Sequence, residues 1–250
     1  MRAIPNRIAD LIEWLYPDWN PDAAWRYLPV ARVIRRALGQ EASILDVGAG
    51  GIGIVPYVRN PCVLTDIGRP AEAIAPFVQG SALALPFRAD SFDGVVSADC
   101  LEHLPPVSRE AAIGELFRVA RALVIIAVPC GPAAAGHDRE LYEAARPDSG
   151  LRGFLKEHLD NGLPSEDELV RWVTAAAQKA FRRPLVETQW NADLRLRYRM
   201  MRGIVRTDAW GAIIRVRLWT PLAPLLARLR PQQGYRLVVI CRDEEAREAG

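Results

Sequence analysis

A glycine-rich stretch carries the first chemical signal in this sequence. Gly48, Gly50 and Gly53 give the spacing G-x-G-x-x-G within SILDVGAGGIGIV. Such a loop between a strand and a helix leaves backbone N–H groups free to point at a ligand, and glycine lets that ligand approach closely. We expect a strand that ends at Val47 and a helix that begins near Ile52.

Two carboxylates flank this loop and bear on the identity of its ligand. Asp46 lies two residues before Gly48, and Asp66 ends the apolar run CVLTD twenty residues after Asp46. The loop would serve NAD or S-adenosylmethionine, and Asp66 could accept hydrogen bonds from the ribose hydroxyls of either. A carboxylate at Asp46 is unfavourable beside a pyrophosphate but favourable beside a cationic amino-acid ligand. The glycine spacing alone is weak evidence.

The three histidines are the candidates for catalytic or metal-binding groups. His103 follows the apolar run FDGVVSA, and His137 follows the run ALVIIAV. We take both as candidates for a base or an acceptor contact. Glu102 and His103 could bind a metal, but the nearby chain adds only Glu110, so we expect no metal site. His158 is expected to be a packing or capping residue.

Short apolar runs bounded by glycine, proline or aspartate predict the strands that position these residues. The runs cover 43–47, 62–66, 73–80, 92–98, 122–128, 184–190 and 235–241. Continuous runs of Val, Ile and Leu are typical of strands covered on both faces. Helical stretches lie between several of them, notably 107–120, so the pattern predicts an α/β fold with a parallel sheet and right-handed crossovers.

Helical spacing outside these runs predicts how the chain is divided. Residues 6–16 and 23–38 have apolar positions every three or four residues, and Pro29 is expected to bend or divide the second segment. We predict an N-terminal helical extension over 1–42 and one domain over 43–250. Two helical insertions are expected in that domain, at about 131–183 and 192–233.

Four segments occur in a fixed order over 44–104: ILDVGAGGIG, VLTDIG, QGSALALPF and SFDGVVSADCLEHL. Together they resemble the motifs of the class I S-adenosylmethionine-dependent methyltransferases, in particular the bacterial methyltransferase type 11 group. The resemblance covers about a quarter of the chain. It implies S-adenosylmethionine as cofactor and a Rossmann-like, doubly wound, mostly parallel sheet of seven strands with an antiparallel last strand, plus the helical insertions.

The resemblance also implies which residues contact the cofactor. These are Asp46, Gly48, Ala49, Gly50, Asp66, Ile67, Ser81 and Ala82. The loop would pass under the methionine part and the ribose, Asp46 would interact with the amino-acid end, and Asp66 would hold the ribose hydroxyls. Ile67 would cover one adenine face, and the N–H of Ala82 would meet the adenine edge. Ser81 stands where the family often has aspartate, a stronger acceptor.

Composition limits the remaining possibilities. The net charge is +2, so no global field marks a DNA-binding protein. The four cysteines lie far apart without a C-x-x-C pair, which favours free thiols in a reducing compartment. The N-terminus lacks the pattern of a secretory signal, and no run of about 18 apolar residues is free of charge. We therefore expect a cytoplasmic protein, in contact with membranes only if its arginine-rich part binds lipid.

That arginine-rich part covers 182–230, where eleven arginines face three acids for a local net charge of +8. One interpretation is a helical cap with arginines on its solvent side. A second is peripheral membrane contact through 195–230 or uptake of a lipid-linked phosphate. A third is contact with RNA phosphates.

Taken together, these features predict methyl transfer from S-adenosylmethionine to oxygen or nitrogen of a small molecule, sugar or lipid-linked glycan. One alternative is a subunit that binds the cofactor without turnover, although nothing in the glycine loop is broken. Another is an RNA methyltransferase. An NAD oxidoreductase ranks below both, because Asp46 and the segment SFD…LEHL oppose it.

Overall fold

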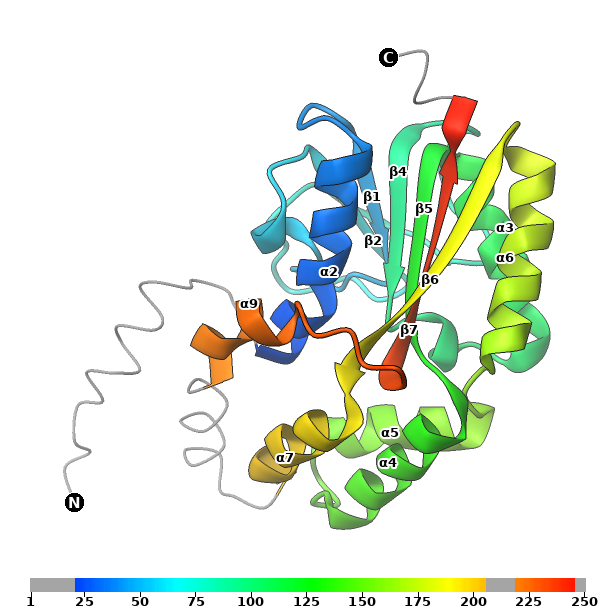
Figure 1. Ribbon diagram of the computed structural model, residues 1–250. Helices are drawn as coiled ribbons and strands as arrows, with labels where there is room; N and C mark the ends of the chain where they lie inside the picture. Colours follow the sequence, from blue (N-terminus) through cyan, green and yellow to red (C-terminus); the bar gives the residue numbers. More distant parts are fainter. Residues whose placement is uncertain (1–20, 206–218, 246–250) are drawn as a thin grey trace.

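A seven-stranded sheet in the order β3-β2-β1-β4-β5-β7-β6 forms the centre of the molecule (Figure 1). The structure is a computed structural model and describes residues 21–205 and 219–245. Strands β1 to β5 are parallel, and β7 is antiparallel to both β5 and β6. The expected Rossmann-like sheet with an antiparallel last strand is therefore confirmed. The helix expected over 6–16 lies outside the described residues.

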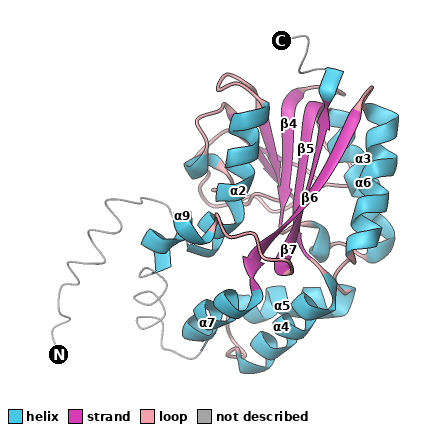
Figure 2. Cartoon of the chain, viewed as in Figure 1, coloured by secondary structure: helices cyan, strands magenta, loops and turns pink. Residues whose placement is uncertain are grey.

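The strands follow the apolar runs of the sequence closely. They span Ile44–Val47 (β1), Cys62–Asp66 (β2), Phe77–Gln79 (β3), Phe92–Ala98 (β4), Ala120–Pro129 (β5), Pro184–Asp193 (β6) and Gly234–Asp243 (β7). The central strands β1, β4, β5 and β7 are buried almost throughout, because helices cover both faces of the sheet (Figure 2). The expected strand over 73–80 is shorter, since Pro76 has no N–H for the ladder.

Helices form two layers and an end cap (Figure 1). The α-helices span Pro21–Ala37 (α2), Pro106–Val119 (α3), Gly131–Ala144 (α4), Gly150–Asn161 (α5), Glu166–Ala180 (α6), Leu194–Val205 (α7) and Ala223–Leu226 (α9). Helix α2 packs on one face of the sheet, and α3 and α6 pack on the other. Helices α4, α5 and α7 share a third core beyond the carboxyl ends of the parallel strands. Among the described residues, no helix has the length and apolarity needed to cross a membrane.

The segment after β1 differs from the expectation of a helix near Ile52. It consists of turns, followed by a short 3₁₀ helix at Val55–Tyr57 (η1). Gly50 and Gly53 have φ angles of +58° and +53°, which an α-helix cannot contain. A Cβ on Gly53 would also lie 2.4 Å from Asp46 Oδ2. The predicted helix start is therefore wrong, and the chain instead wraps tightly over the end of β1.

Helix α2 continues through Pro29, so of the two expectations, a bend or a division, the division is wrong. Proline lacks the N–H that would donate to the carbonyl four residues earlier, which here belongs to Trp25. The buried Asn191 side chain supplies the missing donor, with Nδ2 3.0 Å from the Trp25 carbonyl oxygen. Asn191, near the end of β6, thereby replaces the hydrogen bond that the backbone of α2 cannot form at Pro29.

Candidate functional site

The glycine loop lies at the carboxyl end of β1, against the start of the 3₁₀ helix Leu101–His103 (η2). Gly48 has a φ of +77°, and a Cβ on it would lie 2.6 Å from the Cβ and Sγ atoms of Cys100. Both the backbone conformation and the available space therefore require glycine at this position. The loop forms one wall of a cavity of about 440 Å³, a volume in the range of small-molecule sites.

Asp46 lies beneath this loop. It is fully buried, and its Oδ2 accepts a hydrogen bond from the Ile54 N–H at 2.7 Å. Burial raises the pKa of Asp46 to about 7, although the Ile54 N–H and the Tyr27 hydroxyl both favour the charged form. The side chain does not line the cavity. Asp46 instead supports the turn through its bond to Ile54, whereas the sequence analysis expected it to contact the ligand.

Asp66 connects the loop to β2 and lines the cavity. Its Oδ2 accepts a hydrogen bond from the Gly50 N–H at 2.9 Å, and its Oδ1 accepts one from the Gly68 N–H at 3.2 Å. These two bonds hold the carboxylate at the rim of the loop. The structure therefore brings Asp66 and the glycines together, as the motif spacing predicted.

The other sequence-predicted residues divide into two groups. Those on the cavity wall are Gly48, Ala49, Gly50, Asp66 and His103. Ile67, Ser81 and Ala82 are not among the lining residues, and Ile67 is 75% exposed. His137 is also absent from the wall, because it is buried within α4 with Nδ1 2.9 Å from Arg197 Nη1. Burial, together with the Arg197 charge, lowers the pKa of His137 although Asp138 opposes this.

Charged side chains from distant parts of the chain form the cavity wall opposite the loop. Arg236, at the start of β7, is fully buried and donates to the Asp99 carboxylate from Nε at 2.7 Å and from Nη2 at 2.6 Å. Its Nη2 also lies 3.2 Å from Asp22 Oδ2, and Arg26 Nε lies 3.1 Å from Asp99 Oδ2. We call Asp22, Arg26, Asp99 and Arg236 the ion-pair network.

The network keeps its acids ionised. Burial alone would raise the pKa of Asp99, but the charges of Arg236 and Arg26 hold it below its ordinary value. The pKa of Asp22 is likewise lowered, because three arginine charges outweigh its burial. Asp99 has a φ of +51°, a conformation that non-glycine residues adopt rarely and that occurs often at functional sites.

One feature of the sequence indicates this network, namely a charged residue inside an apolar strand. Arg236 stands inside the apolar strand run YRLVVIC. A charge in a strand that is buried on both faces must have a buried partner of opposite sign. The identity of that partner was out of reach, since Asp99 lies 137 residues earlier in the chain.

A second cluster, of Glu102, His103 and His158, lines the same cavity. His103 Nδ1 lies 2.6 Å from Glu157 Oε2, and His158 Nδ1 lies 2.7 Å from Asp138 Oδ2. Glu102 is fully buried, and neither of its oxygens has a hydrogen-bond partner in the described part of the chain. Burial, followed by the negative charge of Asp99, raises the pKa of Glu102 well above its ordinary value. The sequence interpretation of His158 as a packing residue missed this cluster.

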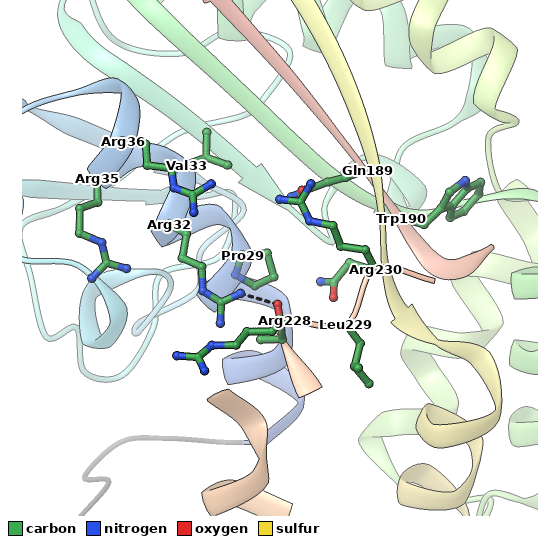
Figure 3. Close-up of a pocket in the computed structure, with 12 residues that line it drawn as sticks. Pro29, Arg32, Val33, Arg35, Arg36, Gln189, Trp190, Arg228, Leu229 and Arg230 are labelled. Atoms are coloured by element: carbon green, nitrogen blue, oxygen red, sulfur yellow. Dashed lines mark hydrogen bonds between the residues drawn. The ribbon is translucent and has the colours of Figure 1, made fainter. Parts of the chain in front are cut away.

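A separate groove of about 470 Å³ lies between α2 and the segment after α9 (Figure 3). Five arginines line it, and we call it the arginine groove: Arg32, Arg35, Arg36, Arg228 and Arg230. Arg32 donates to the backbone carbonyls of Pro224 and Ala227. Among the described residues, none of the five arginines has a carboxylate within ion-pair distance. Burial and the four neighbouring arginine charges lower the pKa of Arg32.

Comparison with known proteins identifies one matching domain. Residues 45–128 match the family model of a methyltransferase domain. No curated protein matches the chain. The solved structure of the plantazolicin methyltransferase BpumL in complex with SAH is similar over 95% of this chain and 89% of that chain, at 9% identity and a TM-score of 0.57.

A second similar structure is a chain from the complex between the Haloferax volcanii Trm112 methyltransferase activator and a putative methyltransferase. The match covers 96% of this chain and 99% of that chain, at 15% identity and a TM-score of 0.53. At these identities the likeness shows the fold, and the family match over 45–128 carries the assignment of the domain.

Proposed function

Since residues 45–128 match a methyltransferase domain, we propose that the chain is an S-adenosylmethionine-dependent methyltransferase that acts on an oxygen or nitrogen atom of a small molecule, sugar or lipid-linked glycan. When bound, the cofactor supplies a methyl group activated as a sulfonium, so the protein mainly positions the acceptor. The observation that supports this proposal is the cavity itself. It joins the glycine loop and Asp66 on one side to Glu102, His103 and His158 on the other.

We assign the cofactor to the glycine-loop side of this cavity. The side-chain position of Gly50 is open space, which leaves the backbone there accessible to close approach, and the Asp66 carboxylate lines the cavity, where we expect it to accept hydrogen bonds from ribose hydroxyls. Asp46 acts from beneath, by holding the turn at Ile54. Ile67, Ser81 and Ala82 stay as proposed contacts of the adenine, on the β2 and β3 side of the loop.

The acceptor is assigned to the side formed by Glu102 and the two histidines. His103 lines the cavity, whereas His137 lies outside it and is held by Arg197. Of the two catalytic candidates from the sequence, the geometry therefore favours His103 as the residue that contacts the acceptor.

Substitution of Asp66 tests the cofactor assignment. We expect Asp66→Ala to weaken binding of S-adenosylhomocysteine by about 1–3 kcal/mol, because ribose hydroxyls lose a charged acceptor. Calorimetric titration measures this change, with Glu41→Ala, an exposed acid that precedes the amino end of β1, as control. An unchanged affinity in Asp66→Ala removes Asp66 from the site, and uptake of NAD in place of S-adenosylhomocysteine contradicts the proposed function.

We also propose that the arginine groove binds a phosphate-bearing part of a partner, such as an anionic membrane surface or a lipid-linked acceptor. Its support is electrostatic, since five arginines line the groove and none of them has a carboxylate within ion-pair distance in the described chain. Arginine forks match phosphate oxygens well. A screen of lysate fractions with the tritiated cofactor would identify the acceptor, and labelled RNA there would favour the RNA alternative.

A further inference from the structure

Glu102, His103 and His158 come together from two separate elements. Glu102 and His103 belong to η2, which directly follows β4, while His158 comes from α5 in the first insertion. Each offers a ligand atom, and these atoms lie within 4.8 Å of one another. The two imidazole rings are 4.9 Å apart between centroids. Two histidines and a carboxylate are a ligand set that binds divalent transition metals.

Both histidines are held in the way that metal-binding histidines usually are. Glu157 engages Nδ1 of His103, and Asp138 engages Nδ1 of His158. A carboxylate at Nδ1 fixes the tautomer and leaves Nε2 as the ring nitrogen available for a metal. His158 Nε2 has no hydrogen-bond partner among the described residues and lies 3.8 Å from Glu102 Oε1.

Glu102 supplies the second independent observation. Its side chain is fully buried, and both oxygens lack a hydrogen-bond donor in the described part of the chain. A buried polar group without a partner costs free energy, so native structures rarely leave one unexplained. A cation between Glu102 and the two Nε2 atoms would satisfy the carboxylate and His158 together.

We propose that Glu102, His103 and His158 bind one divalent transition-metal ion, of the class of Zn²⁺ or Mn²⁺, on the acceptor side of the cavity. This inference rests on the proposed function and deepens it. The three residues line the cavity, so a position on the ion stays open toward the acceptor. An acceptor hydroxyl bound there would lose its proton more easily and would be held in place for methyl transfer.

The separation of the ligand atoms fits binding by small movements of side chains. Tetrahedral ligands about 2.1 Å from a metal lie about 3.4 Å apart. From a spread of up to 4.8 Å, the three groups must therefore draw together on binding. His103 is half-buried and its partner Glu157 is exposed, so the His103 side of the cluster has room to adjust.

Metal binding to the full-length protein tests this proposal directly. After treatment with a chelator and dialysis, calorimetric titration with ZnCl₂ and with MnCl₂ should show about one equivalent bound. His158→Gln and Glu102→Gln should abolish this uptake. Thermal unfolding and titration with S-adenosylhomocysteine establish that each variant is folded, and they report on the cofactor site independently of the metal.

An exposed pair of acids on α5 provides a matched comparison that does not disturb the core. Glu157→Gln should weaken metal binding by roughly 10- to 100-fold, because it removes the partner of His103 Nδ1. Asp160→Asn removes a similar exposed charge, one that pairs with Lys156, and should leave binding unchanged. Absence of metal uptake, or uptake that Glu102→Gln and Glu157→Gln leave intact, overturns the metal site. Cofactor binding in the same samples decides the proposed function separately.

Discussion

Two groups of arginines in this molecule are placed in opposite electrostatic surroundings. In the ion-pair network, Arg236 is fully buried and Arg26 is partly buried, and the two contact Asp22 and Asp99 at 2.6 to 3.3 Å. In the arginine groove, the cations lie near the surface with other arginines as their neighbours. Helix α2 contributes to both, with Asp22 and Arg26 near its start and three groove arginines further along.

The difference shows what each group of charges is available to do. A buried cation must be neutralised by the protein itself, because unpaired charge in the interior is costly. A surface cation is stabilised by water and can stay unpaired until an anion arrives. The network therefore shapes the cavity wall, while the groove is the place where we propose that an anion binds. Three substitutions test this distinction, and they are ordered by the size of the change that we expect.

Arg236→Met should have the largest effect. It keeps most of the side-chain volume but leaves Asp99 buried without its bidentate partner, so we expect the free energy of unfolding to fall by about 3–5 kcal/mol. Urea unfolding followed by circular dichroism measures this change. Arg36→Met in the groove is the matched control and should alter stability by no more than about 0.5 kcal/mol. Equal losses of unfolding free energy in the two variants would contradict the view that burial distinguishes the network from the groove.

Asp46 offers an intermediate case, since it is buried near the network without a hydrogen-bonded arginine. Its folded-state pKa of about 7 lies above the ordinary value of 3.8. The folded protein thus holds this proton more tightly than the unfolded chain, and the resulting stability is complete below about pH 4 and is lost as the pH rises to about 7.

Asp46→Asn cannot titrate, so the variant should lose less stability than the wild type between about pH 5 and pH 8. The expected difference is roughly 3 kcal/mol, from 1.36 kcal/mol for each of the two units between pH 5 and the folded-state pKa of about 7. Urea unfolding at the two pH values measures it. Parallel pH profiles for the wild type and the variant would mean that Asp46 keeps an ordinary pKa in the folded protein.

Arg36→Gln should show the smallest effect, and only on ligand binding. We expect binding to vesicles with anionic lipid to weaken by about 1 kcal/mol, roughly fivefold, and to decline with added salt. Vesicle flotation measures this change, and pyrophosphate in competition separates a phosphate site from a surface effect. Arg242→Gln is the control, because Arg242 already pairs with Glu187. No flotation of the wild type at low salt contradicts the membrane proposal, and equal losses in both variants contradict the groove.

Local sequence patterns predicted most of the sheet. The runs 62–66 and 92–98 agree with β2 and β4 residue for residue. A strand covered on both faces needs a continuous apolar run, and the residues that end it are usually turn formers, so both features are visible locally. The helix after the glycine loop was wrong for an equally local reason. The φ angles of Gly50 and Gly53 depend on how the turn packs over Asp46, which the motif spacing does not show.

The candidate site was predicted only where it lies on the four family-like segments over 44–104. Gly48, Gly50 and Asp66 were identified because the loop and the next strand are adjacent in both sequence and space. His158 was not, because 55 positions separate it from His103 and its partner Asp138 lies on another helix.

Local patterns in the sequence were enough to predict most of the strands and the glycine turn. Each depends on hydrophobic burial or backbone freedom that neighbouring residues express together. Only the tertiary structure decided which charges are neutralised, which stay open to a ligand, and which three side chains meet beside the cavity. Coulomb and coordination contacts depend on distances across the fold, and charged residues far apart in the chain leave no periodic pattern from which those distances could be read.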